Sequence, residues 1–212
     1  MIVARDLTFR YRRNAPNIIE HLDHEFQRGT MTALTGPSGG GKSTLLYVLG
    51  LMLTAAEGAL LIDGNDTLHL TDGERSALRA RYMGFVFQDA MLDPSRTVLD
   101  NVLEGALYSG RGKSRAHDRA LELLHAVGVV HRFDHKPGEI SGGQAQRVAL
   151  CRALLRSPDV ILADEPTGNL DPDSAKLVWR MLEQAAAAGA CVIVATHDPV
   201  AAGQCHQWVT LK

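Results

Sequence analysis

The sequence predicts an α/β fold whose sheet is mainly parallel. A short apolar run at Met31–Leu34 precedes a glycine-rich loop, and a helical segment, Lys42–Met52, follows that loop. Near the C-terminus, apolar strand-like runs again alternate with a helical segment, whereas residues 97–155 show only helical patterns. Strands that alternate with helices are typical of parallel crossover units. The helical stretch therefore predicts a lobe inserted between two parts of a sheet-forming core.

The remaining elements follow from local patterns. Residues 2–12 alternate between apolar and polar side chains, as in a half-buried strand, and a turn separates them from a second strand at Ile18–Phe26. These two strands predict an antiparallel β portion at the N-terminus. Capping-box spacing at Thr71–Glu74 predicts the start of a short helix. Further strands are predicted at Gly58–Ile62, Gly84–Phe87, Val160–Ala163, Cys191–Thr196 and Trp208–Leu211, and further helices at Val98–Leu107, Ala116–Val127, Gly142–Leu155 and Pro172–Ala188, with Gly110–Lys113 between the first two of these.

The composition predicts a soluble globular protein. Hydrophobic residues make up 45% of the 212-residue chain and charged residues 22%, and the net charge of −2 argues against a surface that coats nucleic acid. The longest apolar run, Ala185–Ala195, is far shorter than the about 20 residues that cross a bilayer. We see no signal peptide. Cys151, Cys191 and Cys205 form no C-x-x-C pair, so we expect packed or surface thiols in the reducing cytoplasm.

The glycine-rich loop, GPSGGGKST, carries the strongest chemical signal. It matches G-x-x-x-x-G-K-[ST] in the strand–loop–helix context that this motif requires. Glycines let several backbone N–H groups point into one concavity, and the helix N-terminus adds positive charge there. Lys42 is predicted to reach the β- and γ-phosphates of a nucleoside triphosphate, and Ser43 to be a Mg²⁺ ligand. The residues predicted to bind the nucleotide in this loop are Gly36, Ser38, Gly39, Gly40, Gly41, Lys42, Ser43 and Thr44.

Two adjacent carboxylates, Asp164 and Glu165, end the apolar strand at Val160–Ala163. An acidic strand end by itself is usually a loop cap. Downstream of a phosphate-binding loop, Asp164 is predicted to hold Mg²⁺, directly or through water, and Glu165 to be the base for an attacking water.

A second glycine pair precedes the third helix of the lobe. Ser141 is a good N-cap residue, and the simplest interpretation is a helix start and nothing more. Successive glycines weaken a helix start, however, and this cost favours close approach of an anionic ligand. One chain is not expected to bring both anion sites to one phosphate, whereas a head-to-tail partner can. The residues of this predicted second site are Ser141, Gly142, Gly143 and Gln144.

These three motifs occur in the order and spacing of ABC-transporter nucleotide-binding subunits, and the chain resembles that family over essentially its whole length. The resemblance implies a recA-like P-loop core, an inserted helical lobe, and a dimer that sandwiches two ATP molecules. It implies one domain, in which residues 1–88 and 159–212 form the core with the nucleotide site and about 89–158 form the lobe. The implied partners are a second ATP-binding subunit and a transmembrane permease subunit. The implied location is the cytoplasmic face of the membrane.

The resemblance also assigns roles to residues that are unremarkable alone. Tyr11 matches the aromatic residue that stacks on adenine; a lone tyrosine here would be a core residue. Gln88 matches the glutamine that touches Mg²⁺ and signals to the membrane domain. Asp171 matches the acidic residue of the loop that reaches across the dimer, and is otherwise a helix cap before Pro172. His197 matches the histidine that contacts the γ-phosphate and takes part in catalysis with Glu165 and Gln88.

Within the family, the runs Pro166–Asp171 and Gly84–Gln88 resemble the branch of lipoprotein-releasing, macrolide-exporting and cell-division ATPases. The chain departs from the branch at Ile140, at Ala145 and at Leu92–Pro94, where two leucines and a proline are usual. The leading hypothesis is an ATP-hydrolysing motor subunit with Mg²⁺ as cofactor and no nucleic-acid partner. The alternatives are a soluble ABC ATPase acting on ribosomes or DNA, and a small-molecule kinase, which would leave Ser141–Gln144 unexplained. The substrate and the direction of transport do not follow from the sequence.

Overall fold

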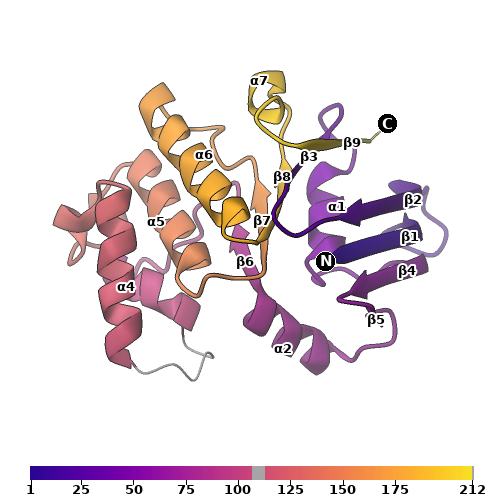
Figure 1. Ribbon diagram of the computed structural model, residues 1–212, viewed down its shortest axis with the longest axis horizontal. Helices are drawn as coiled ribbons and strands as arrows, with labels where there is room; N and C mark the ends of the chain where they lie inside the picture. Colours follow the sequence, from indigo (N-terminus) through magenta and orange to yellow (C-terminus); the bar gives the residue numbers. More distant parts are fainter. Residues whose placement is uncertain (107–112, 212) are drawn as a thin grey trace.

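The computed structural model describes residues 1–106 and 113–211 and contains two β-sheets with helices around them (Figure 1). Part of the helix predicted to Leu107, and most of the separator predicted at Gly110–Lys113, lie outside the described residues. The predicted α/β fold class is confirmed, with a parallel sheet, antiparallel strands and helices.

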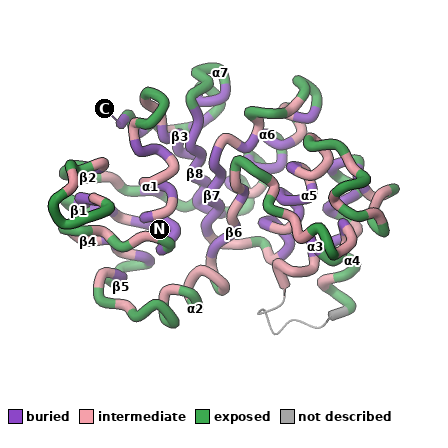
Figure 2. The backbone as a smooth tube through the Cα atoms, turned by 180° about the vertical axis from the view of Figure 1, so that it is seen from behind, coloured by how far each residue is buried: buried purple, intermediate pink, exposed green. Residues whose placement is uncertain are grey.

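The larger sheet has five strands in the order β6-β7-β8-β3-β9, and all its pairings are parallel. These strands are β3 (Met31–Thr35), β6 (Met83–Val86), β7 (Val160–Asp164), β8 (Cys191–Ala195) and β9 (Gln207–Thr210). Every residue of β7 and β8 is buried, as expected for a parallel sheet covered on both faces. Figure 2 shows this buried sheet running through the middle of the molecule.

The smaller sheet is antiparallel, in the order β2-β1-β4-β5. It consists of β1 (Ile2–Phe9), β2 (Ile19–Phe26), β4 (Glu57–Ile62) and β5 (Asn65–Asp66). The strand predicted over residues 2–12 is too long, because β1 ends at Phe9 and a turn follows, so Tyr11 lies outside the strand with 60% of its surface exposed. Within β1 the pairing shifts register where Asp6 adopts a left-handed φ of 47°, and Leu7, Thr8 and Phe9 are all buried.

Helix α1 (Lys42–Leu49) lies between the two sheets (Figure 1). Its buried leucines and valine pack with side chains of the antiparallel sheet and with one face of the parallel sheet, including Leu34, Leu162 and Ile193. The opposite face of the parallel sheet, including Ile161 and Val192, packs with helices. Alternate residues of one strand thus serve two cores.

On this opposite face, α5 (Gly142–Leu154), α6 (Pro172–Ala187) and the short α7 (Pro199–Ala202) contact the strands, and α3 (Val98–Leu103) and α4 (Lys113–Ala126) pack on α5. Helix α2 (Asp72–Tyr82) precedes β6, and 3₁₀ turns occupy Glu104–Ala106, Val130–Arg132 and Pro137–Glu139. Cys151, Cys191 and Cys205 are buried free thiols, and burial raises their pKa values to about 12, 11 and 11. Within the described residues, no helix is both long enough and apolar enough to span a bilayer.

Candidate functional site

Four parallel strands deliver the predicted site residues to one edge of the sheet. The glycine-rich loop follows β3, Gln88 lies two residues after β6, Glu165 follows β7, and His197 lies two residues after β8. Carboxyl ends of parallel strands meet at the same edge, where open α/β sheets bind ligands. A cleft of about 310 Å³ opens there, and its lining consists of Ser38, Gly39, Gly41, Lys42, Ser43, Thr44, Gln88, Glu165 and His197.

The shape of the loop depends on glycine at particular positions. Gly41 is the N-cap of α1 with φ 86°, and a Cβ atom there would lie 2.7 Å from Cγ2 of Ile18. Gly36 has φ 141°, and its Cβ would lie 2.6 Å from the carbonyl oxygen of Leu211. Both conformations favour glycine, and neither neighbour leaves room for a side chain. The loop is thereby held close to the start of α1, where backbone N–H groups are unpaired and attract anions.

Lys42 lies over the loop that it follows. Its ammonium group donates to the carbonyl oxygens of Gly36 (3.0 Å) and Pro37 (2.9 Å), and only 9% of the residue is exposed. A buried ammonium needs acceptors, and these two carbonyls supply them within the chain. Phosphate oxygens in the cleft would offer stronger, charged acceptors to the same group.

Asp164 is buried beneath the cleft, with 3% of its surface exposed. Ser43 Oγ donates to its Oδ1 at 2.9 Å, and the Tyr47 hydroxyl donates to its Oδ2 at 3.2 Å. Burial raises the pKa of the Asp164 carboxyl, and the hydrogen bonds from Ser43 and Tyr47 act in the opposite direction. Burial also raises the pKa of Tyr47, with a smaller contribution from the Asp164 charge.

Glu165 is held by residues at the end of β8. Its Oε2 accepts from the hydroxyl of Thr196 (3.2 Å), and its Oε1 accepts from the backbone N–H of His197 (2.9 Å). The Nδ1 atom of His197 lies 2.6 Å from the same Oε1. Glu165 also has a left-handed φ of 43°, an unusual conformation for a residue with a side chain and one that clusters at functional sites. The carboxylate is thus aimed by two hydrogen-bond donors and by the His197 ring, while the Glu165 side chain stays 14% exposed.

Gln88 lines the cleft, and Tyr11 contacts the phosphate loop. The backbone before Gln88 is fixed by the buried Gln146 of α5, whose Nε2 donates to the carbonyl oxygen of Phe87 at 2.8 Å. The hydroxyl of Tyr11 lies 3.1 Å from Oγ1 of Thr44, so its exposed ring stands beside the phosphate loop. The alternative that Tyr11 is a core residue is therefore wrong.

The second predicted anion site lies outside this cleft. Ser141 caps α5: its hydroxyl oxygen accepts from the backbone N–H of Gln144 (3.2 Å), and its own backbone N–H donates to Oε1 of Gln144 (2.9 Å). The predicted helix cap is therefore confirmed. Asp171 caps α6 by accepting from Asp173 and Ser174, and the hydrogen bonds from Ser174 lower its pKa. Neither Asp171 nor any residue of Ser141–Gln144 lines the cleft.

Tyr47, Thr196 and Gln146 are site residues that the sequence reasoning missed. Tyr47 follows Ser43 by four residues on one helix, and this spacing places both side chains on one face. That spacing was a usable signal. The contacts of Thr196 with Glu165 and of Gln146 with Phe87 join residues 31 and 59 positions apart, and no local pattern indicates them.

The donor set fits a triphosphate with a hard cation. Ser43 and Asp164 offer oxygen ligands side by side, and oxygen is the ligand type that Mg²⁺ prefers. Among the described residues, no group of three or more His, Cys, Asp or Glu side chains could hold a metal alone. Mg²⁺ is commonly bound by one or two protein groups together with substrate phosphates, as this arrangement would require.

Comparisons with known proteins agree with this geometry. The family model described as "ABC transporter" matches residues 19–168. The chain is 40% identical to "Lipoprotein-releasing system ATP-binding protein LolD 1" of Rhodospirillum rubrum, covering 97% of this chain and 91% of that protein. It is also 40% identical to "Macrolide export ATP-binding/permease protein MacB" of Rhodopseudomonas palustris, covering 100% of this chain. The chain spans only 32% of the length of that protein, and 30% of a "Probable export ATP-binding/permease protein" of Pseudomonas fluorescens.

Solved structures give the same result. The dimeric structure of MJ0796, "a Bacterial ABC Transporter Cassette", has a TM-score of 0.92 and 35% identity, and covers 100% of this chain and 94% of that one. A second structure of MJ0796, in a post-hydrolysis state bound to ADP and Pi, has a TM-score of 0.92 at 33% identity, with the same coverage. The resemblance to the lipoprotein-releasing and macrolide-exporting branch is confirmed. The chain belongs to the ABC transporter family, as an ATP-binding and ATP-hydrolysing cassette.

Proposed function

We propose that this cassette is the motor of a transporter whose transmembrane part is a separate subunit, and that it works on the cytoplasmic face of the membrane. The observation that carries the proposal is the meeting of the phosphate loop, Glu165, His197 and Gln88 in one cleft. Residues 1–88 and 159–212 form the core in this proposal, and about 89–158 form the lobe that moves with the membrane partner.

The residues in and around the cleft have separate roles in ATP hydrolysis. The loop amides and Lys42 bind the phosphates, and Tyr11 stacks on the base. Glu165 accepts a proton from the attacking water while His197 and Thr196 hold its carboxylate in place. His197 also faces the γ-phosphate. Ser43, Asp164 and Gln88 would hold Mg²⁺, which supplies positive charge to the phosphate oxygens.

The signature residues Ser141–Gln144 are assigned to a second copy of the cassette. A Cβ atom added to Gly142 would meet nothing within 4 Å, and Gly142 has no left-handed backbone that would favour glycine. Within the described residues, no contact therefore explains this glycine at a helix start. The similar MJ0796 cassette is dimeric. A head-to-tail dimer of this chain would place the amides at the start of α5, together with Asp171, against the nucleotide of the other copy.

A groove beside Gln88 suits the membrane partner. It encloses about 380 Å³, its lining combines Phe85 and Phe87 with charged residues such as Glu104 and Arg152, and the exposed Met91 marks its rim. Met91 is 64% exposed and has a left-handed φ of 47°. The name of one relative joins an ATP-binding part and a permease in a single protein, which supports a permease as the partner of this cassette. We assign the groove to a cytoplasmic segment of the permease.

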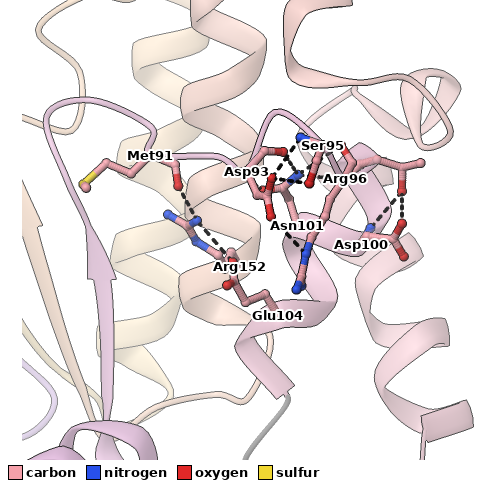
Figure 3. Close-up of polar contacts among 9 residues, drawn as sticks. Met91, Asp93, Ser95, Arg96, Asp100, Asn101, Glu104 and Arg152 are labelled. Carbon is pink, nitrogen blue, oxygen red and sulfur yellow. Dashed lines mark hydrogen bonds and ion pairs between the residues drawn. The ribbon is translucent and has the colours of Figure 1, made fainter.

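The loop that forms this rim is tied to the helices behind it. Arg152 of α5 donates to the carbonyl oxygens of Ala90 (2.9 Å) and Met91 (2.8 Å), and the Met91 side chain points away from it (Figure 3). Asn101 of α3 is completely buried and bonds both the N–H (2.7 Å) and the carbonyl oxygen (3.1 Å) of Asp93. A segment that pushes on Met91 would therefore move α3 and α5 with the loop.

Replacing the base tests the catalytic part of the proposal. Glu165→Gln keeps the size of the side chain but removes its basicity, so ATP turnover should fall by about 10²–10⁴-fold. ATP binding should persist, and light scattering should show a dimer in ATP that wild type forms only transiently. Full turnover by the variant would overturn the role of Glu165.

Affinity purification tests the transporter part. Tagged Glu165→Gln protein should recover a transmembrane protein from its own detergent-solubilised membranes when ATP is present. The double variant with Met91→Asp, which places a charge on the rim, should bind ATP equally but lose that protein. Recovery of ribosomes or DNA without a membrane protein, or equal recovery by both variants, would contradict the assignment.

A further inference from the structure

Tyr47 gives Asp164 its second side-chain hydrogen bond. Ser43 and Tyr47 lie four residues apart on α1 and so project from one face of the helix. Ser43 bonds Oδ1 at 2.9 Å and Tyr47 bonds Oδ2 at 3.2 Å, so each carboxylate oxygen has a donor from the same helix. The phosphate-loop motif accounts for Ser43 and ends before Tyr47.

The Tyr47 ring is held by aromatic neighbours at the end of β6. Its centroid lies 6.4 Å from that of Phe87, with the ring planes tilted by 54°. Phe87 stacks on Phe85 at 5.7 Å, and the Phe87 carbonyl is fixed by Gln146. The contact with Phe87 favours the ring position in which the Tyr47 hydroxyl reaches Asp164.

We propose that Tyr47 is a positioning residue that fixes the plane of the Asp164 carboxylate for a divalent cation. This inference rests on the proposed function, in which Ser43 and Asp164 hold Mg²⁺. Donors on both oxygens oppose rotation of the carboxylate and leave its remaining lone pairs for the cation. Asp164 is only 3% exposed, so water does not readily replace a lost donor. Residues that orient a metal ligand in this way typically contribute about 10–100-fold to metal affinity.

Tyr47→Phe tests the proposal because it keeps the ring and removes only the hydroxyl. Calorimetry should show Mg²⁺ affinity in the presence of ADP falling by about 10-fold or more. ADP affinity in EDTA should stay at the wild-type value. Tyr82→Phe is the matched control, since it removes a tyrosine hydroxyl from α2, outside the cleft, and should leave both affinities unchanged.

Combining substitutions shows whether Tyr47 acts through Asp164. In an Asp164→Asn background, adding Tyr47→Phe should cause no further loss of Mg²⁺ affinity. Any of three results would overturn the proposal. Tyr47→Phe could bind Mg²⁺ with wild-type affinity, or it could lower Mg²⁺ affinity further in the Asp164→Asn background. The third result is that Tyr47→Phe weakens ADP binding in EDTA as much as it weakens Mg²⁺ binding.

Failure of this inference is distinguishable from failure of the cation site itself. If Ser43→Ala and Asp164→Asn weaken Mg²⁺ binding while Tyr47→Phe does not, only the role of Tyr47 is wrong. If none of the three changes Mg²⁺ affinity, the proposed cation site is wrong as well.

Discussion

The ammonium group of Lys42 illustrates how one residue connects the folded loop to its ligand. It donates to the carbonyls of Gly36 and Pro37, so the loop itself compensates a buried charge. Binding a triphosphate would replace neutral acceptors by charged ones. Hydrogen bonds to charged groups contribute about 1.5–3 kcal/mol, which corresponds to about 10–100-fold in affinity.

Lys42→Ala should therefore weaken ATP binding by about 10–100-fold, because the variant cannot bond the β- and γ-phosphates. Titration with a fluorescent ATP analogue measures this change. Lys176→Ala is the control, since Lys176 lies on the exposed face of α6, 3.4 Å from Asp173. Equal affinity in wild type and Lys42→Ala would remove Lys42 from the nucleotide site.

The sequence alone predicts the positions of individual residues where a motif specifies them. Lys42, Ser43 and Glu165 lie at the cleft because the motif and the strand order place them there. It could not distinguish a core tyrosine from an exposed one at Tyr11, because alternation continued past the point where β1 ends. Nor could it find the bonds that aim Glu165, since Thr196 is brought to it only by the pairing of β7 with β8.

Two helices begin with the same capping box, and only one of them is assigned a ligand. Thr71 and Glu74 form the box of α2, and Ser141 and Gln144 form that of α5. In each pair, the side chain of either residue accepts a hydrogen bond from the backbone N–H of the other. The two caps therefore make similar contributions to stability but differ in their proposed function.

Removing each cap should separate stability from function. Ser141→Ala and Thr71→Ala should each lower the free energy of unfolding by about 0.5–2 kcal/mol in urea denaturation. Only Ser141→Ala should also reduce ATP-dependent dimerisation, measured by light scattering of each variant in the Glu165→Gln background. A similar loss of dimer in Thr71→Ala would mean that stability alone explains the effect.

Most elements were predictable from sequence, including the four-residue strands β6 and β9, whereas β5 and α7 were not. Helices α5 and α6 and strands β3, β7 and β8 begin and end within a residue or two of their predicted bounds. Helix α1 ends at Leu49, before the predicted Met52, because Gly50 caps it and Leu51 is left-handed with φ 59°. Strand β5 and helix α7 span two and four residues, too few for a periodic pattern.

The two sheets of the whole molecule are joined by ion pairs as well as by the core around α1. Arg28, between β2 and β3, donates to Asp63 at the end of β4 (2.9 Å) and to Asp159 before β7 (2.5 Å). The amino group of Met1 lies 2.7 Å from Asp63. Hydrogen bonding to that amino group, and then to Arg28, lowers the pKa of Asp63 below its usual value.

A lowered pKa makes this junction sensitive to acid in a definite direction. Asp63 stabilises the fold at pH values above its unfolded pKa, near 3.8, and the contribution is lost as pH falls through the lower folded pKa. Asp63→Asn should therefore be less stable than wild type from pH 7 to about pH 5, by less than about 1 kcal/mol because the pairs are partly exposed.

The difference should shrink below about pH 4, where wild-type Asp63 gains a proton. Urea denaturation at a series of pH values measures it, and Arg28→Met should reduce the same pH dependence by removing one partner. A difference between wild type and Asp63→Asn that stayed constant down to pH 3 would show that the carboxylate charge does not hold the two sheets together.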